Sequence, residues 1–97
     1  MMVLVTYDVE TTTAKGRARL RRVAKSCVNY GQRVQNSVFE CVLDPTQFTL
    51  LKNNLLSLID KEKDSLRFYF MGKKWEARVE HHGIGETYNP ESDSIII

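Results

Sequence analysis

Residues 1–8 read Met-Met-Val-Leu-Val-Thr-Tyr-Asp, an apolar and partly β-branched run that ends on a carboxylate. This composition favours a strand that is buried on both faces. Asp8 is the first charged residue of the chain and stands at the carboxyl end of that strand. Because folds often place their functional side chains at strand ends, Asp8 is the first candidate for chemistry.

An amphipathic helix is expected next. Residues 11–13 are three threonines, which supply N-cap candidates, and Gly31 is expected to end the helix as a C-cap. Apolar residues between them recur at helical spacing and predict one stripe that packs on a sheet: Leu20, Val23, Ala24, Cys27 and Val28.

The rest of the chain alternates again between strands and a helix. Residues 33–43 are strand-like but longer than the usual strand and polar at 35–37, so a bend or bulge that gives two short strands is expected. Asp44-Pro45 then predicts a second helix, with Asp at the N-cap and Pro at the first helical position. Residues 66–71 alternate as a strand, and residues 75–82 form a weaker one.

This order of elements is the βαββαβ pattern, which predicts an α+β, ferredoxin-like sandwich with an additional short C-terminal strand. One domain is expected over residues 1–97, with a core motif region at 1–72 and a tail and strand at 86–97. The small size favours a homodimer, because a partner chain would help to bury apolar area. The apolar end Ile95–Ile97 should be covered by this protomer's sheet edge or by another's.

Composition excludes several classes of protein. Of the 97 residues, 42% are hydrophobic and 27% charged, as in soluble globular proteins, and no apolar stretch approaches a membrane span of about 20 residues. We therefore expect no membrane partner, and we expect the protein to be cytoplasmic. Cys27 and Cys41 could in principle pair, but each stands among apolar neighbours, where a reduced core thiol is the ordinary role.

The first helix is strongly basic. Residues 15–25 hold six cations and no acid, although the net charge of the whole chain is only +2. The cations form two neighbouring rows, which repel one another unless an anion lies nearby: Arg17, Arg21 and Lys25 in one, Lys15, Arg19 and Arg22 in the other. This arrangement favours a nucleic-acid backbone as partner, and Arg33 extends the patch. The alternative is a merely solvated helix face.

Three segments give the chain a specific resemblance to a known family. The strand ending in Tyr7-Asp8-Val9, the Arg-rich helix and the segment Arg-Val-Gln-Asn-Ser-Val-Phe-Glu at residues 33–40 resemble the small CRISPR-associated protein family of the adaptation module, the second in that naming series. The resemblance covers essentially residues 1–72. It implies a ferredoxin-like homodimer that is a metal-dependent endonuclease and that also bridges two dimers of the CRISPR integrase. It further favours Arg17 and Arg19 as nucleic-acid contacts.

Asp8 is then expected to be the catalytic residue and metal ligand. Magnesium, or another divalent cation such as manganese, prefers about six oxygen ligands, so a single carboxylate is a poor site. A two-fold axis that brings together Asp8 of both protomers would supply the second carboxylate. The alternative role of Asp8 is to cap a turn or the next helix.

Three further residues are expected to support this site. Tyr7 alternates to the other sheet face from Asp8, so it should pack beneath the site. The Ser37 hydroxyl could bind phosphate or water near Asp8. The Phe39 ring could stack on a base, but an interface or core position is favoured.

Two further groups of residues give weaker signals, and structural roles are favoured or equally expected for them. His81 and His82 are adjacent and should point to opposite faces of a strand, at the surface. The run Lys73-Lys74-Trp75 could grip nucleic acid or form a turn with a packed indole. Two functions stay open: a metal-dependent endonuclease acting on duplex DNA or single-stranded RNA, and a non-catalytic architectural subunit that binds duplex DNA and bridges integrase dimers.

Overall fold

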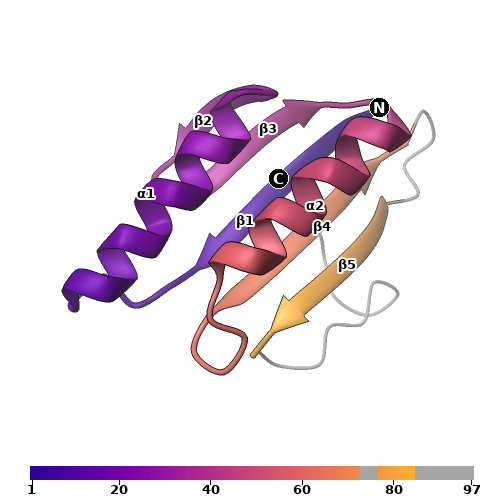
Figure 1. Ribbon diagram of the computed structural model, residues 1–97. Coiled ribbons are helices and arrows are strands. Elements are labelled where there is room, and N and C mark those ends of the chain that lie inside the picture. The colour runs from indigo at the N-terminus through magenta and orange to yellow at the C-terminus, as the bar shows by residue number, and fades with distance from the viewer. Residues whose placement is uncertain (73–76, 85–97) are drawn as a thin grey trace.

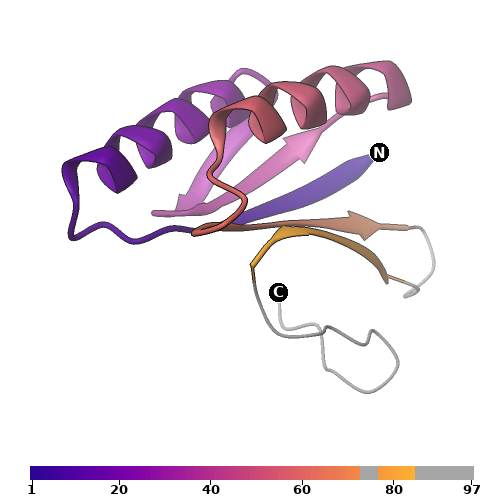
Figure 2. The ribbon, with the colours of Figure 1, turned by 60° about the horizontal axis from the view of Figure 1, so that its bottom comes forward.

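Two helices cover one face of an antiparallel sheet in the computed structural model, which describes residues 1–72 and 77–84 (Figures 1 and 2). Within these residues the sheet order is β2-β3-β1-β4-β5. The strands are β1 (Met2–Asp8), β2 (Gly31–Gln35), β3 (Val38–Val42), β4 (Ser65–Met71) and β5 (Ala77–Gly83), and the helices are α1 (Ala14–Val28) and α2 (Pro45–Leu58). The predicted ferredoxin-like α+β fold is confirmed, with β5 added at one edge. The predicted roles of residues 73–75 and of the tail at 86–97 lie outside the described residues.

Strand β1 lies in the middle of the sheet, and its alternate side chains point to the two faces. Val3, Val5 and Tyr7 point to the helices and are at most 1% exposed. The other face, called the helix-free face below, carries Leu4, which is buried, and Asp8, which is exposed. The prediction that both faces of this strand are buried is therefore only partly correct, because both described helices lie on the same side.

The core lies between the helices and the sheet. Helix α1 contributes Val23, Ala24 and Cys27, which pack with side chains such as Phe39 and Phe68 from the strands. Cys27 and Cys41 are both free and buried, and the Cys41 thiol lies 3.6 Å from the Cys27 carbonyl oxygen that it donates to. Their predicted role as reduced core thiols is confirmed.

The apolar stripe of α1 is one residue shorter than predicted. Val28 is 46% exposed, because it is the last residue of the helix and has turned away from the sheet.

Side-chain caps fix where both helices begin. The Thr13 hydroxyl accepts a hydrogen bond from the Gly16 amide at 3.0 Å, as one of the three threonines was expected to do. Asp44 and Gln47 form a reciprocal capping box at the start of α2, with bonds of 2.7 and 3.0 Å. The predicted start of the second helix is confirmed.

Gly31 is not the C-cap of α1, which was the prediction. The helix ends at Val28 with Asn29 as its C-cap, and Gly31 is the first residue of β2. A side chain there is excluded by a close approach, since a Cβ atom would lie 1.7 Å from the Glu40 carbonyl oxygen of β3. The glycine is needed for strand pairing rather than for helix termination.

The predicted bend divides residues 31–42 into two strands. The register of β2 against β3 shifts between Arg33 and Gln35, and Ser37 lies in the turn that follows. The Tyr7 amide donates to the Ser37 carbonyl oxygen at 2.9 Å, so this turn is bound to the end of β1. The bond places Ser37 beside Asp8.

Candidate active site at the end of strand β1

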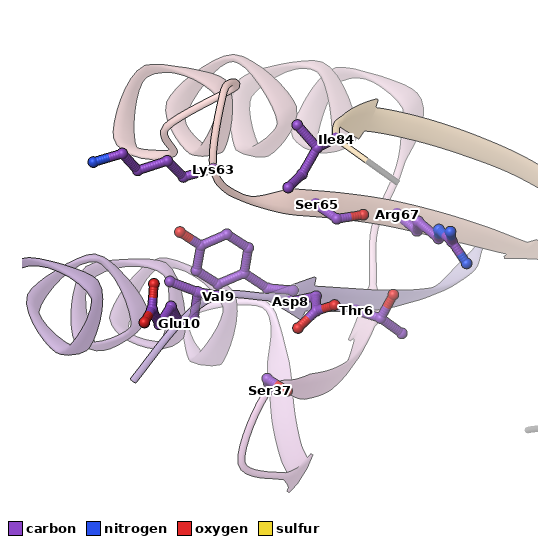
Figure 3. A pocket seen from close by; sticks show the side chains of 10 residues that line it. Thr6, Asp8, Val9, Glu10, Ser37, Lys63, Ser65, Arg67 and Ile84 are labelled. Atoms are coloured by element: carbon purple, nitrogen blue, oxygen red, sulfur yellow. The ribbon is translucent and has the colours of Figure 1, made fainter. Parts of the chain in front are cut away.

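A pocket of about 640 Å³ lies where β1 ends (Figure 3). Its described lining combines two acids and two bases: Asp8, Glu10, Lys63 and Arg67. Small hydroxyl side chains also line the pocket: Thr6, Ser37 and Ser65. Acids can hold a cation and bases an anion, so the pocket has the groups to bind a metal ion and a phosphate together.

Asp8 is exposed at the edge of this pocket. No residue of the described ranges donates a hydrogen bond to its carboxylate, and the N-cap of α1 is Thr13. The alternative role of Asp8 as the cap of the next helix is therefore not what the structure shows. Its side chain belongs to the helix-free face, because it alternates with Tyr7, which points to the helices.

The described residues of this chain alone do not assemble a metal centre. Among residues 1–72 and 77–84, no group of three or more His, Cys, Asp or Glu side chains is placed to hold an ion. Asp8 and Glu10 line the same pocket, but they are only two carboxylates. A divalent cation there would need ligands from a second chain, from water or from substrate.

A buried polar network lies beneath the site, on the helix side of the sheet. Asp64 has no exposed surface, and its carboxylate accepts a hydrogen bond from the Tyr7 hydroxyl. Arg19 donates to both Asp64 oxygens, from Nε at 2.8 Å and from Nη2 at 3.1 Å. The Asp60 amide adds a bond of 2.9 Å to Oδ2. These donors compensate a charge that would otherwise be buried alone.

The network fixes the protonation of its members. Burial alone would raise the pKa of Asp64, but the hydrogen bonds from Arg19, Tyr7 and the Asp60 amide outweigh burial and hold this pKa below its ordinary value. Burial raises the pKa of the Tyr7 phenol, and the Asp64 carboxylate raises it further. Tyr7 is therefore a neutral donor at neutral pH. It packs beneath the site, as its position in the strand predicts.

Arg19 has a different partner from the one expected. Its row on α1 and the family resemblance both favoured a nucleic-acid contact, but its guanidinium is bound to Asp64, and its side chain is only 15% exposed. The pairing has a simple cause: a fully buried carboxylate needs a cation, and Arg19 is the one that reaches it. In this structure Arg19 supports the end of β1, and its contact with nucleic acid stays a prediction.

The other predicted nucleic-acid contacts are exposed: Arg17, Arg21, Lys25 and Arg33. Arg17 donates to the Thr11 carbonyl oxygen at 3.0 Å, which holds its side chain near the start of α1. None of the three α1 cations lines the described wall of the Asp8 pocket. Arg33 lines a neighbouring pocket of about 230 Å³, which shares Asp8 and Ser37 with the first. The structure thus brings Arg33 to the site and leaves the others on the helix layer.

Phe39 belongs to the core. Its side chain has no exposed surface, so it cannot stack on a base, and the Arg33 guanidinium carbon lies 5.6 Å from its ring centroid. Of the two positions that the sequence favoured for Phe39, the interface and the core, the structure shows the core.

Two residues of the site were not found from the sequence. Asp64 is the last residue of a charged run at 60–64, and no local pattern marks it as buried. Arg67 could have been found from the sequence. Leu66 and Phe68 of β4 point into the core, so alternation places Arg67 on the other face of the sheet, which is the face of Asp8.

The two histidines occupy opposite faces of β5, as predicted. The His81 Nδ1 atom accepts a hydrogen bond from Arg67 Nε at 3.0 Å, on the helix-free face. The His82 ring packs edge-on against Phe68, with centroids 6.1 Å apart, on the helix side. Both are half-buried rather than fully at the surface.

Known proteins resemble this chain over most of its length. The sequence model of the family described as "CRISPR associated protein Cas2" matches residues 1–79. A Halalkalibacterium halodurans protein named CRISPR-associated endonuclease Cas2 is 63% identical, over 98% of this chain and 99% of its own. A Chlorobaculum tepidum protein named CRISPR-associated endoribonuclease Cas2 is 57% identical, over 99% of this chain and 100% of its own.

Solved structures agree with this relationship. The crystal structure of Streptococcus pyogenes Cas2 at pH 6.5 is 63% identical in sequence and superposes with a TM-score of 0.74, covering 77% of this chain and 90% of that one. A hypothetical protein from Thermus thermophilus, 33% identical, gives a TM-score of 0.65 over 77% of this chain and 85% of its own. In the described residues, no helix is long and apolar enough to cross a membrane.

Proposed function

This chain belongs to the CRISPR-associated Cas2 family, and we propose that it is a metal-dependent endonuclease that hydrolyses phosphodiester bonds of nucleic acid in CRISPR adaptation. The observation that carries the proposal is the exposed Asp8 carboxylate, which accepts no hydrogen bond from the described residues and lines a pocket with both acids and bases. The names of the relatives, endonuclease and endoribonuclease, support the same reaction class.

The residues at the end of β1 fit a hard divalent cation once a second copy is present. Asp8 of each protomer would hold magnesium or manganese, with water and substrate oxygens as the other ligands. When bound, such an ion lowers the pKa of a coordinated water and offsets negative charge on the phosphate. The chain must provide a surface through which two Asp8 pockets meet.

The helix-free face provides that surface. Met2, Val42 and Met71 are neighbours in register on this face, and the first two side chains are 42% and 67% exposed. Asp8 lies at the other end of the same face of β1. Pairing two copies face to face along this side of the sheet would bury these side chains, and a two-fold axis that passes beside Asp8 would bring the two carboxylates together.

Each remaining group has a task that follows from its position. The Ser37 hydroxyl, in the turn bound to β1, can hold a phosphate oxygen or a water beside Asp8. Tyr7, Asp64 and Arg19 fix the end of β1 and so the direction of the Asp8 side chain. The exposed cations of α1 bind the nucleic-acid backbone away from the scissile bond, so substrate binding and cleavage use different residues.

The separation of the basic helix α1 from the Asp8 pocket favours a second function. Arg17, Arg21 and Lys25 are exposed on the helix layer and form a basic row that does not depend on Asp8. A dimer would present two such rows, which suits a subunit that holds duplex DNA and bridges integrase dimers without cleaving.

Cleavage of labelled duplex DNA and of single-stranded RNA, titrated with magnesium, tests the proposal. We expect Asp8→Asn to lose cleavage at least about 100-fold, since the neutral amide is a poor ligand, and to retain nucleic-acid binding in the same samples. Glu62→Gln is the matched control, because Glu62 is an exposed acid outside both pockets. Equal activity of Asp8→Asn and wild type would overturn the proposal, and binding without cleavage in every variant would favour the architectural function.

A further inference from the structure

A second pocket adjoins the Asp8 pocket and has a different lining. Its volume is about 230 Å³, and it shares Asp8 and Ser37 with the first pocket. The first pocket extends to Ser65 of β4 and to Ile84 after β5, whereas the second extends to α1 and to the turn between β2 and β3. Figure 3 shows Asp8 between Ser65 and Ser37. A nucleic-acid strand that is cut at Asp8 therefore has a pocket on each side of the cut.

Apolar and polar groups meet in the second pocket. Val9 and Leu20 supply apolar side chains, and both pack against the core from its edge. Arg33 of β2 and Asn36 of the following turn supply a guanidinium and an amide. Apolar side chains, a guanidinium plane and an amide are the groups that bind an unpaired base, by stacking on its face and by hydrogen bonds to its edge.

Asn36 is not explained by the turn in which it lies. Asparagine is common in turns because its side chain bonds the nearby backbone or because it tolerates a positive φ. Neither reason applies here. In the part of the chain that the structure describes, no residue other than glycine has a positive φ, and the exposed Asn36 amide makes no hydrogen bond to a described residue. Its donor and acceptor are therefore open to a ligand.

Arg33 is held in this pocket by its Nε atom. Nε donates to the Asn36 carbonyl oxygen at 2.7 Å, and the guanidinium carbon lies 5.6 Å from the centroid of the Phe39 ring. Among the described residues Arg33 has no further polar partner, so its two Nη groups are open. The bond to Asn36 keeps the guanidinium beside the open amide. A guanidinium that is fixed in this way offers a plane on which a base can stack.

The second pocket is too small for a base pair. Its volume of about 230 Å³ lies below the range of about 300–1,000 Å³ that is usual for pockets of drug-sized ligands. A paired base also has its faces covered by stacking and its pairing edge occupied. An unpaired base offers both a face to Arg33 and an edge to Asn36.

We infer that the second pocket binds one unpaired base next to the scissile phosphate, with Arg33 against the face of the base and Asn36 at its edge. The inference deepens the proposed nuclease function, on which the role of the pocket in cleavage rests. It names the substrate class as single-stranded or locally unpaired nucleic acid. Fully paired duplex binds through the exposed cations of α1 and does not enter this pocket.

Titration of the nucleoside 5′-monophosphates into the isotope-labelled full-length protein without divalent cations tests the pocket, and ribose 5-phosphate is the ligand that lacks a base. NMR follows the Asn36 side-chain amide and the Arg33 Nε–H. We expect saturable shifts with a nucleotide and an affinity about 10-fold weaker in Asn36→Ala. Asn53→Ala is the matched control, because Asn53 is an exposed asparagine of α2 outside both pockets, and it should bind as wild type does. Absence of saturable shifts in wild type, equal affinity for ribose 5-phosphate, or unchanged affinity in Asn36→Ala would overturn the inference.

Two further measurements separate the parts of the inference. Arg33→Lys keeps the charge but removes the plane, so nucleotide affinity should fall about 5-fold, and wild-type affinity in this variant would remove the stacking role of Arg33. A duplex with one bulged nucleotide should be cut beside the bulge, in preference to the same duplex without it. Equal cleavage of both duplexes would refute the role of the pocket in cleavage and leave the nuclease function standing. Because the titration contains no metal, it decides the existence of the pocket even if neither duplex is cut.

Discussion

The hydrogen bond from Tyr7 to Asp64 gives a prediction that isolates the buried network from the rest of the core. Tyr7→Phe keeps the ring, which is 1% exposed, and removes only the hydroxyl that donates to the Asp64 carboxylate. A hydrogen bond to a charged group contributes about 1.5–3 kcal/mol. Asp64 keeps its bonds from Arg19 and the Asp60 amide, so we expect the free energy of unfolding to fall by about 2 kcal/mol.

Urea denaturation at pH 7 measures this loss, and one fixed protein concentration is used because the stability of the proposed dimer would depend on concentration. With a slope of roughly 1–2 kcal/mol per molar urea, the midpoint should fall by about 1–2 M. Tyr30→Phe is the matched control, since Tyr30 is a half-buried tyrosine outside the network, and it should change stability by less than about 0.5 kcal/mol.

The pH dependence gives a second signature. The pKa of Asp64 is lowered in the folded state, so the network stabilises the protein above the unfolded value of about 4 and loses this effect as the pH falls through the folded value. The difference between wild type and Tyr7→Phe should therefore be full at pH 7 and shrink below about pH 4. A loss equal to that of Tyr30→Phe, or one independent of pH, would refute the assignment of Tyr7 as a donor to an ionised Asp64.

Three further predictions follow from other parts of the fold. Arg17→Ala and Arg21→Ala should each weaken duplex DNA binding and lower the slope of log affinity against log salt by about 1, measured by fluorescence anisotropy; an unchanged slope would place the DNA elsewhere. Val42→Lys, on the exposed apolar end of the helix-free face, should shift a dimer to monomer in sedimentation at micromolar concentration, and a dimer that persists would exclude this face as the interface. Gly31→Ala should destabilise the protein by at least about 1–3 kcal/mol in chemical denaturation, because the added Cβ meets the Glu40 carbonyl, and a neutral effect would contradict the close approach of β2 and β3.

Local signals in the sequence predicted most of the fold. The alternation along β4, the cap at Asp44 and the polar interruption at 35–37 each act over a few residues, so their physical meaning is complete within the segment. Gly31 was misassigned because a glycine after a helix ordinarily is a C-cap. Its real constraint comes from Glu40 on the neighbouring strand.

The sequence predicted only those residues of the candidate site whose positions follow from their neighbours along the chain. Asp8 stands at a strand end, and its exposure on the face opposite Tyr7 follows from alternation. The partner of Arg19 was not predictable, because Asp64 lies 45 residues away and is brought close by the pairing of β1 with β4. The same pairing brings Arg67 to the Asp8 pocket. Sequence periodicity identifies the face of a side chain, but the register between strands decides its neighbours.

Manganese binding followed by electron paramagnetic resonance shows whether Asp8 holds the divalent cation that the proposed cleavage requires. Titration of wild type and Asp8→Asn, with Glu62→Gln as control, is predicted to show one tightly bound ion per dimer in wild type and control and none in Asp8→Asn. Manganese binding by Asp8→Asn with the affinity and stoichiometry of wild type would exclude Asp8 as the metal ligand.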